Sequence, residues 1–112
     1  MKLITAIIRT EQLAAVETGL EGFGVKGLTV SEASGYGRQR GRRQTYRGAS
    51  HTVNRIPKVR VEILAEDLEA IRIIEVILDC AHTGEPGDGK VWVTTVDQVI
   101  RVSDRAEGEA AI

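Results

Sequence analysis

The sequence predicts a single α+β domain of the ferredoxin-like type, a βαββαβ sandwich with a long loop between its second and third strands. Three observations support this fold class. Strand and helix patterns follow the order β-α-β, a long polar segment, then β-α-β. The chain has 112 residues, the size of one domain spanning 1–112. It is 42% hydrophobic but only 4% aromatic, so its core must consist mainly of Val, Ile, Leu and Ala.

The first β-α-β unit is read from the first 34 residues. Residues 3–8 form a short apolar run rich in β-branched side chains, which predicts a buried strand. Residues 11–22 carry apolar side chains at spacings of three and four, so we expect an amphipathic helix closed by Gly22 and Gly24. Residues 25–34 alternate apolar and polar side chains, the pattern of a strand with one buried face.

The second unit begins with another alternating strand over residues 56–64, where Pro57 sits at the strand start and its missing N–H is tolerated. Residues 67–80 predict a second amphipathic helix. Its helical spacing is carried by Leu68, Ile71, Ile74 or Glu75, and Leu78. Residues 90–96 predict a fourth strand.

The C-terminal residues carry weaker patterns. Residues 99–102 are a candidate for a short fifth strand. Residues 104–112 are polar and rich in alanine, so we expect this tail to be mobile unless it docks on the domain. Val and Ile occur on both phases of several strands, which indicates that the second face of the sheet is also covered. For so small a domain, association with further copies of the chain would provide that cover.

The polar segment between the two units, about residues 35–55, has an unusual charge. Residues 33–61 contain no acidic residue and eight basic ones: Arg38, Arg40, Arg42, Arg43, Arg47, Arg55, Lys58 and Arg60. Seven basic and sixteen acidic residues remain in the rest of the chain. A loop this long and this asymmetric in charge predicts a functional segment that projects from the domain.

Several classes of protein are disfavoured by what the sequence lacks. Cys80 is the single cysteine, and with His51 and His82 it gives no zinc-binding pattern or internal disulfide. The two histidines have no nucleophile or carboxylate at a catalytic motif spacing, so we do not expect an enzyme. No run approaches the roughly 20 apolar residues of a membrane span, and residues 1–9 are too short for a signal peptide. We therefore expect a cytoplasmic protein.

Two glycine-containing segments are candidates for phosphate binding. Residues 83–90 read Thr-Gly-Glu-Pro-Gly-Asp-Gly-Lys, in which glycines allow backbone N–H groups to converge before Lys90. An ordinary glycine-rich turn is the alternative, and the spacing differs from a Walker A motif. Residues 35–39 read Gly-Tyr-Gly-Arg-Gln, where Arg38 offers a forked donor to phosphate or carboxylate. Arg101 could also reach a phosphate, although most surface arginines are merely solvated.

Taken together, four ordered segments resemble the PII signal-transduction proteins. They are residues 35–39, Tyr-Arg-Gly-Ala at 46–49, Pro-Lys-Val at 57–59, and residues 83–90, and the similarity covers the whole chain without a gap. The resemblance implies a homotrimer with nucleotide sites in the clefts between neighbouring subunits. It also implies three functional loops: a T-loop over about residues 36–55, a B-loop over about 83–90 and a C-terminal loop over about 102–112.

The same resemblance implies the ligands. ATP or ADP would be bound by Gly27, Thr29, Gly37, Arg38, Glu62, Gly87, Asp88, Gly89, Lys90 and Arg101. Of these, Gly27, Thr29 and Glu62 would lie near the adenosine. In family members 2-oxoglutarate binds beside Mg-ATP, so Gln39 would supply an oxygen on the side of the Mg²⁺ ion and Lys58 would pair with a carboxylate of 2-oxoglutarate.

The T-loop would contact a target protein, either a membrane transporter such as an ammonium channel or a metabolic enzyme. The contacts would come from Arg42, Arg43, Tyr46 and Arg47, and Arg47 matches the residue with which relatives plug an ammonium channel. One alternative is a PII-like sensor of ADP or AMP that regulates another transport system, such as bicarbonate uptake. A second is nucleic-acid binding by the basic loop, which the lack of surface aromatics for base stacking disfavours.

Two positions depart from the family pattern. His51 stands where many relatives carry the tyrosine that is uridylylated or adenylylated, so we predict no nucleotidylation at the loop tip. Ser103 replaces a second arginine two places after Arg101, which removes a charged hydrogen bond worth about 1.5–3 kcal/mol. We expect weaker triphosphate binding and a preference for ADP or AMP, unless Arg105 compensates.

Overall fold

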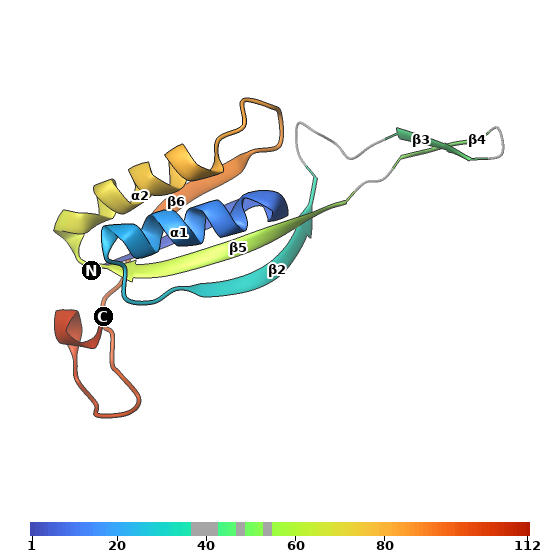
Figure 1. The fold of residues 1–112 in the computed structure, drawn as a ribbon. Coiled ribbons are helices and arrows are strands. Elements are labelled where there is room, and N and C mark those ends of the chain that lie inside the picture. The colour runs from blue at the N-terminus through green and yellow to red at the C-terminus, as the bar shows by residue number, and fades with distance from the viewer. Residues whose placement is uncertain (37–42, 47–48, 53–54) are drawn as a thin grey trace.

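The computed structural model describes residues 1–36, 43–46, 49–52 and 55–112 and has an α+β fold (Figure 1). Its helices and strands in chain order are β1 (Lys2–Arg9), α1 (Leu13–Phe23), β2 (Thr29–Gly35), β3 (Arg43–Tyr46), β4 (Ala49–Thr52), β5 (Ile56–Ala65), α2 (Asp67–Ala81) and β6 (Gly89–Thr95). Short 3₁₀ helices, η1 (Thr10–Gln12) and η2 (Gly108–Ala111), precede α1 and end the chain.

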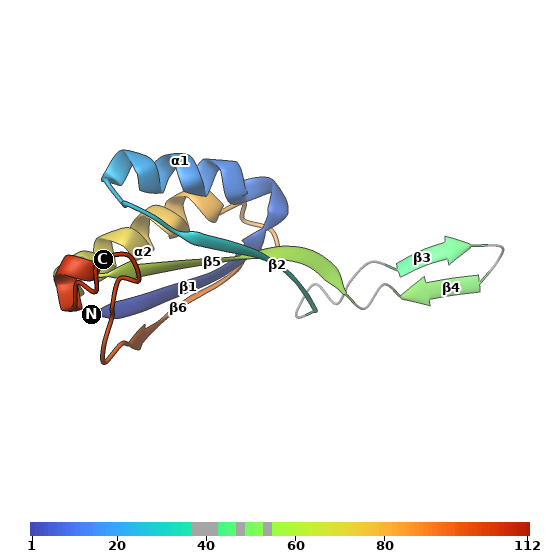
Figure 2. The same cartoon turned by 90° about the horizontal axis from the view of Figure 1, so that it is seen from below.

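One four-stranded antiparallel sheet forms the body of the domain, in the order β2-β5-β1-β6. Both helices lie on the same face of this sheet (Figures 1 and 2). The register places Thr29, Glu62, Thr5 and Trp92 in one row across all four strands. The predicted order of strands and helices and the predicted sheet are therefore confirmed.

Aliphatic side chains fill the layer between the helices and the sheet. Successive strand side chains point to opposite faces, so every second residue of β1 and β5 faces the helices. The fully buried large side chains are Ile4, Ile8, Val16, Leu20, Val61, Ile63, Ile73 and Ile77. No aromatic residue belongs to this buried set, which confirms the aliphatic core expected from composition.

Helix α1 packs closely on α2 at a glycine. A Cβ atom on Gly19 would lie 2.6 Å from Cys80 Sγ and 3.1 Å from Val76 Cγ1, so only glycine permits this approach of the two helices. The helix ends at Gly24, whose φ of 106° is the left-handed conformation typical of a helix C-terminus. Gly22 lies inside α1, one turn before the predicted close.

The apolar residues that predicted α2 do not face the core. Leu68, Ile71 and Leu78 are exposed, whereas the buried face consists of Ala70, Ile73, Ile77 and Ala81. Both sets have helical spacing, so the period identifies a helix but leaves open which face packs. The helix is confirmed; the apolar repeat used to predict it is the outward one.

The C-terminal segment also differs from expectation. Residues 99–102 form no strand, and Ile100 makes only an isolated bridge to Glu107. The chain turns back because Asp104 accepts from the Ala106 N–H (3.0 Å) and Arg105 adopts a φ of 60°. Backbone hydrogen bonds from Arg101 to Ala106 and from Gly108 to Val99, both 2.9 Å, close the resulting hairpin. The tail is therefore folded back, with η2 at its end.

The long polar segment contains secondary structure that the sequence reading did not predict. Strands β3 and β4 pair antiparallel, from Arg43 opposite Thr52 to Tyr46 opposite Ala49. They form a second, two-stranded sheet (Figure 1). The only large apolar residue in this stretch is Val53, so apolar alternation, the usual sign of a strand, is missing here.

Candidate functional site

The B-loop connects α2 to β6 and is organised by the carboxylate of Asp88. This carboxylate accepts hydrogen bonds from the Thr83 N–H (2.8 Å), the Gly84 N–H (3.0 Å) and the Thr83 hydroxyl. The amides of Thr83 and Gly84 therefore point inward to Asp88. Asp88, predicted to hold a nucleotide phosphate, fixes the shape of the loop in this structure.

Arg9 joins the end of β1 to the same loop, and the sequence reading missed it. Its Nε donates to Asp88 Oδ1 (3.0 Å) and its Nη2 donates to the Pro86 carbonyl (2.7 Å). The side chain is largely buried. Arg9 directly follows the first apolar run, and its register partner in β5 is Lys58. A basic residue at the end of a strand beside a predicted ligand-binding lysine is the signal that could have identified it.

Lys58 lies on the other side of the B-loop, as expected of a residue in the predicted effector site. Its ammonium group donates to the Gly87 carbonyl. Burial lowers the pKa of Lys58, and the neighbouring positive charge of Arg9 lowers it further. Two cations thus converge on one loop, opposed there by the Asp88 carboxylate.

The pKa of Asp88 is held well below its usual range. The main cause is the hydrogen bond from the Thr83 hydroxyl, followed by those from the Thr83 N–H and from Arg9. His82 Nδ1 lies 3.7 Å from the same carboxylate. Asp88 is therefore ionised throughout the physiological range and keeps the loop closed upon itself.

Three glycines give the B-loop its course into β6. Gly84, Gly87 and Gly89 have φ values of 89°, 98° and 100°, which other residues rarely adopt. At Gly89 the space is also closed, because a Cβ atom would lie 1.7 Å from the Ile7 carbonyl oxygen. The prediction that these glycines permit special backbone conformations is confirmed. Lys90 follows, exposed and in register with Ile7.

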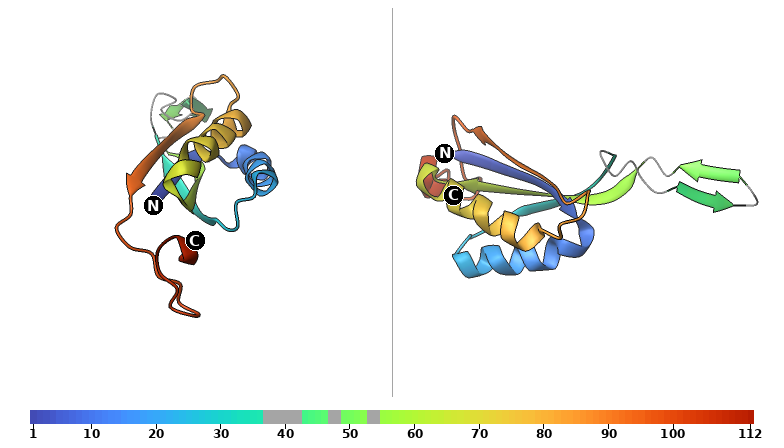
Figure 3. Two further views of the ribbon diagram at one scale, coloured as in Figure 1. Left: turned by 90° about the vertical axis from the view of Figure 1, so that its left-hand side faces the viewer. Right: turned by 90° about the horizontal axis from the view of Figure 1, so that it is seen from above.

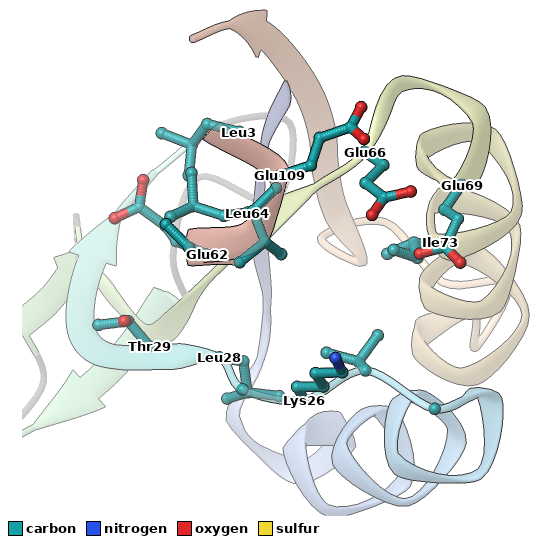
Figure 4. Close-up of a pocket in the computed structure, with 15 residues that line it drawn as sticks. Leu3, Lys26, Leu28, Thr29, Glu62, Leu64, Glu66, Glu69, Ile73 and Glu109 are labelled. Atoms are coloured by element: carbon teal, nitrogen blue, oxygen red, sulfur yellow. The ribbon is translucent and has the colours of Figure 1, made fainter. Parts of the chain in front are cut away.

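A second group of predicted residues lines a cleft of about 670 Å³, shown in Figure 4. Gly27, Thr29 and Glu62 are among its lining residues, and Thr5 Oγ1 donates to Glu62 Oε2 (3.1 Å). Its apolar lining includes Leu3 and Leu64, both on the sheet face that the helices leave open. Apolar surface beside polar groups suits a flat, partly polar ligand such as a nucleoside.

Arg101 lies in the C-terminal hairpin and is engaged there. Its guanidinium donates to Asp104 Oδ2 (2.9 Å) and to the Ala110 carbonyl (2.7 Å). The hairpin ends with Ala111 and Ile112, which also line the cleft. Arg101 thus belongs to the same end of the domain as Thr29 and Glu62.

The two groups lie far apart within one chain. Strand β6 separates the B-loop from the C-terminal hairpin by seven residues, roughly 20 Å. Figures 1 and 3 show the two segments at opposite ends of the sheet. Thr29 and Lys90 lie on the two edge strands, three strand spacings or roughly 14 Å apart. A single chain therefore does not bring Lys90 together with Arg101 or Thr29.

Comparison with known proteins identifies the family. Residues 1–106 match the family described as nitrogen regulatory protein P-II. The chain belongs to the nitrogen regulatory protein P-II family. It is 46% identical to a nitrogen regulatory protein P-II of Azospirillum brasilense and 45% identical to one of Rhizobium meliloti. It is 40% identical to the nitrogen regulatory protein GlnK of Escherichia coli K12, and each of these matches covers the full length of both chains.

Five of the P-II site residues predicted from sequence lie outside the described residues: Gly37, Arg38, Gln39, Arg42 and Arg47. Arg43 and Tyr46 are placed only as backbone positions in β3. The described part of the chain contains no cluster of three or more His, Cys, Asp or Glu side chains that could hold a metal ion. Within that part, no helix is long and apolar enough to cross a membrane.

Proposed function

We propose that this chain is a P-II signal-transduction regulator that binds ATP or ADP, senses 2-oxoglutarate with Mg²⁺, and controls a target protein through its T-loop. The full-length match to relatives named nitrogen regulatory proteins carries this proposal. Those names also favour it over a sensor for another transport system and over nucleic-acid binding.

The nucleotide site is completed by a second copy of the chain. The phosphate end would be the B-loop with Gly87, Gly89 and Lys90, and the adenosine end would be the cleft beside Thr29. Because these groups lie at opposite ends of one domain, a nucleotide that uses both must lie between two copies. The open face of the sheet supports association, since it exposes Trp92 and Leu64 without a covering layer. A closed ring of three copies would repeat this contact at each junction.

Basic groups around the B-loop suit anionic ligands. Lys90 would pair with nucleotide phosphates, while Lys58 and Arg9 would face a dicarboxylate such as 2-oxoglutarate. Mg²⁺ takes few protein oxygens and accepts the rest from phosphate and substrate groups. That fits a loop whose one carboxylate, Asp88, is already occupied, and it leaves Gln39 as the protein ligand.

The basic T-loop would recognise an acidic surface on the target. Arg42, Arg43, Tyr46 and Arg47 would make the contacts, at the cytoplasmic face of a transporter or on an enzyme of nitrogen or carbon metabolism. Ligand binding at Gln39 and Lys58, at the two ends of the T-loop, would shift the balance between its conformations. The size of that shift is set by the difference in ligand affinity between them.

Titration calorimetry with ATP and ADP, with and without 2-oxoglutarate and Mg²⁺, tests the proposal. We expect both adenylates to bind, and 2-oxoglutarate to bind only with Mg-ATP. Lys90→Met should abolish adenylate binding, and Lys58→Met should abolish only the 2-oxoglutarate response. Arg72→Met, an exposed position on α2, is the control and should behave as the wild type. Absence of adenylate binding by the wild-type protein would contradict the proposal.

A further inference from the structure

Helix α2 presents an apolar strip on the face opposite the core. Leu68, Ile71 and Leu78 are 92%, 70% and 52% exposed. At 100° per residue these three side chains fall within an arc of roughly 80°, along about 15 Å of the helix. Isolated apolar residues on a surface are ordinary, but three aligned on one helix face mark a contact surface.

The charges along this strip have a specific order. Arg72 and Glu75 lie on the strip between its two leucines, and Asp79 lies beside Leu78. Within the described part of the chain, neither Arg72 nor Glu75 forms an ion pair. Glu75 and Asp79 disfavour an anionic lipid surface, and Arg72 disfavours a uniformly basic partner helix.

The strip is complementary to itself when reversed. Leu68 and Leu78 lie five residues to either side of position 73, and Arg72 and Glu75 flank nearly the same point. In an antiparallel pair of α2 helices, Leu68 of each copy therefore meets Leu78 of the other. The same arrangement sets Arg72 of each copy against Glu75 of the other. Such reciprocal contacts are the signature of a two-fold interface.

We propose that this strip, residues Leu68, Ile71, Arg72, Glu75 and Leu78, is a self-association surface through which α2 pairs antiparallel with α2 of a second copy. The nucleotide-binding residues lie elsewhere, so the proposal goes beyond the regulatory function and does not rest on it. The facing area of two helices about four turns long is below that of typical stable interfaces. The association is therefore concentration-dependent and adds to whatever assembly the open sheet face forms.

Sedimentation velocity over a protein concentration series tests the pairing. The wild-type average mass should rise with concentration above that of its smallest assembly. Leu68→Ser with Leu78→Ser should shift this rise to concentrations at least about tenfold higher. Val102→Ser, at a position 96% exposed in the C-terminal hairpin, is the matched control and should match the wild type. Circular dichroism should show unchanged helix content in all variants, because these side chains are exposed.

A charge exchange gives the decisive comparison. Arg72→Glu and Glu75→Arg should each weaken association, because each places like charges opposite one another, and the double variant should recover it. Failure of the double variant to recover would overturn the antiparallel pairing. A wild-type mass independent of concentration would also overturn it. So would a smaller minimum assembly for the leucine variant, because the strip would then belong to the primary oligomer interface. Adenylate binding, measured in parallel, should be unchanged throughout.

Discussion

Gly89 is the residue at which the structure makes its sharpest prediction. Gly89→Ala places a Cβ atom 1.7 Å from the Ile7 carbonyl oxygen and 2.8 Å from the Ile7 carbonyl carbon. Both are backbone atoms, so no side-chain rotation relieves the clash. The pairing of β6 with β1 must open at its last positions, where Gly89 faces Ile8 and Lys90 faces Ile7. Lys90 moves with it.

The expected cost combines two effects. An alanine with positive φ costs about 1–3 kcal/mol, and each lost ladder hydrogen bond costs about 1 kcal/mol. We therefore expect Gly89→Ala to lower the free energy of unfolding by about 3–5 kcal/mol. Gly24 provides a matched control, because its φ is 106° and a Cβ there meets nothing within 4 Å. Gly24→Ala should carry only the conformational cost.

Thermal denaturation without nucleotide, at one fixed protein concentration, distinguishes the two variants. A difference of about 2 kcal/mol corresponds to roughly 8 °C in Tm for a domain near this size. Gly89→Ala should melt lower than Gly24→Ala by about that amount and should bind ADP more weakly. Equal melting temperatures would refute the reasoning, because the clash would then cost nothing.

The remaining predictions concern charged groups. Asp88→Asn should speed hydrogen exchange at the Gly84 amide, while the exposed control Asp97→Asn should not. Because the pKa of Asp88 is lowered, its stabilising contribution is present at neutral pH and is lost only as pH falls through the depressed folded-state value; the stabilities of wild type and Asp88→Asn should converge in strong acid. The lowered pKa of Lys58 means that 2-oxoglutarate affinity should fall as pH rises before the ordinary lysine range is reached, and Lys58→Arg should delay that fall. Acetylation of the Met1 amine should lower Tm slightly by removing its 2.8 Å ion pair with Asp67.

Two of these predictions have clear contrary outcomes. Equal exchange rates at Gly84 in both aspartate variants would mean that Asp88 does not hold the B-loop. Affinity for 2-oxoglutarate that is flat with pH up to the ordinary lysine range would mean that the Lys58 ammonium group is not the pairing group.

The sheet and the first helix could be predicted from sequence because local pattern and burial agree there. In α1 the apolar repeat is the buried one, with Val16 and Leu20 in the core. In α2 two apolar repeats share one helix, and only tertiary packing decides that Ile73 and Ile77 face inward. A periodic pattern carries no information about which of two equally spaced faces meets the sheet.

The site was predicted unevenly for a similar reason. The glycines of the B-loop are visible in sequence because their conformations need that residue type. Arg9 was missed because its partners, Asp88 and Pro86, are about 80 positions away and meet it only through the β1–β6 pairing. The C-terminal hairpin was missed because side-chain hydrogen bonds from Arg101 and to Asp104 hold it, with little apolar burial.

A mixing experiment tests the central claim, that adenylate is bound between copies. Lys90→Met removes the phosphate end of the site and Arg101→Gln removes the opposite end, so neither variant alone should bind ATP in calorimetry. Co-expressed, they should form mixed assemblies in which some junctions combine an intact Lys90 with an intact Arg101. We predict that ATP binding returns in these mixed assemblies. Mixed assemblies that stay as inactive as either variant would show that both residues act within one chain, contrary to this account.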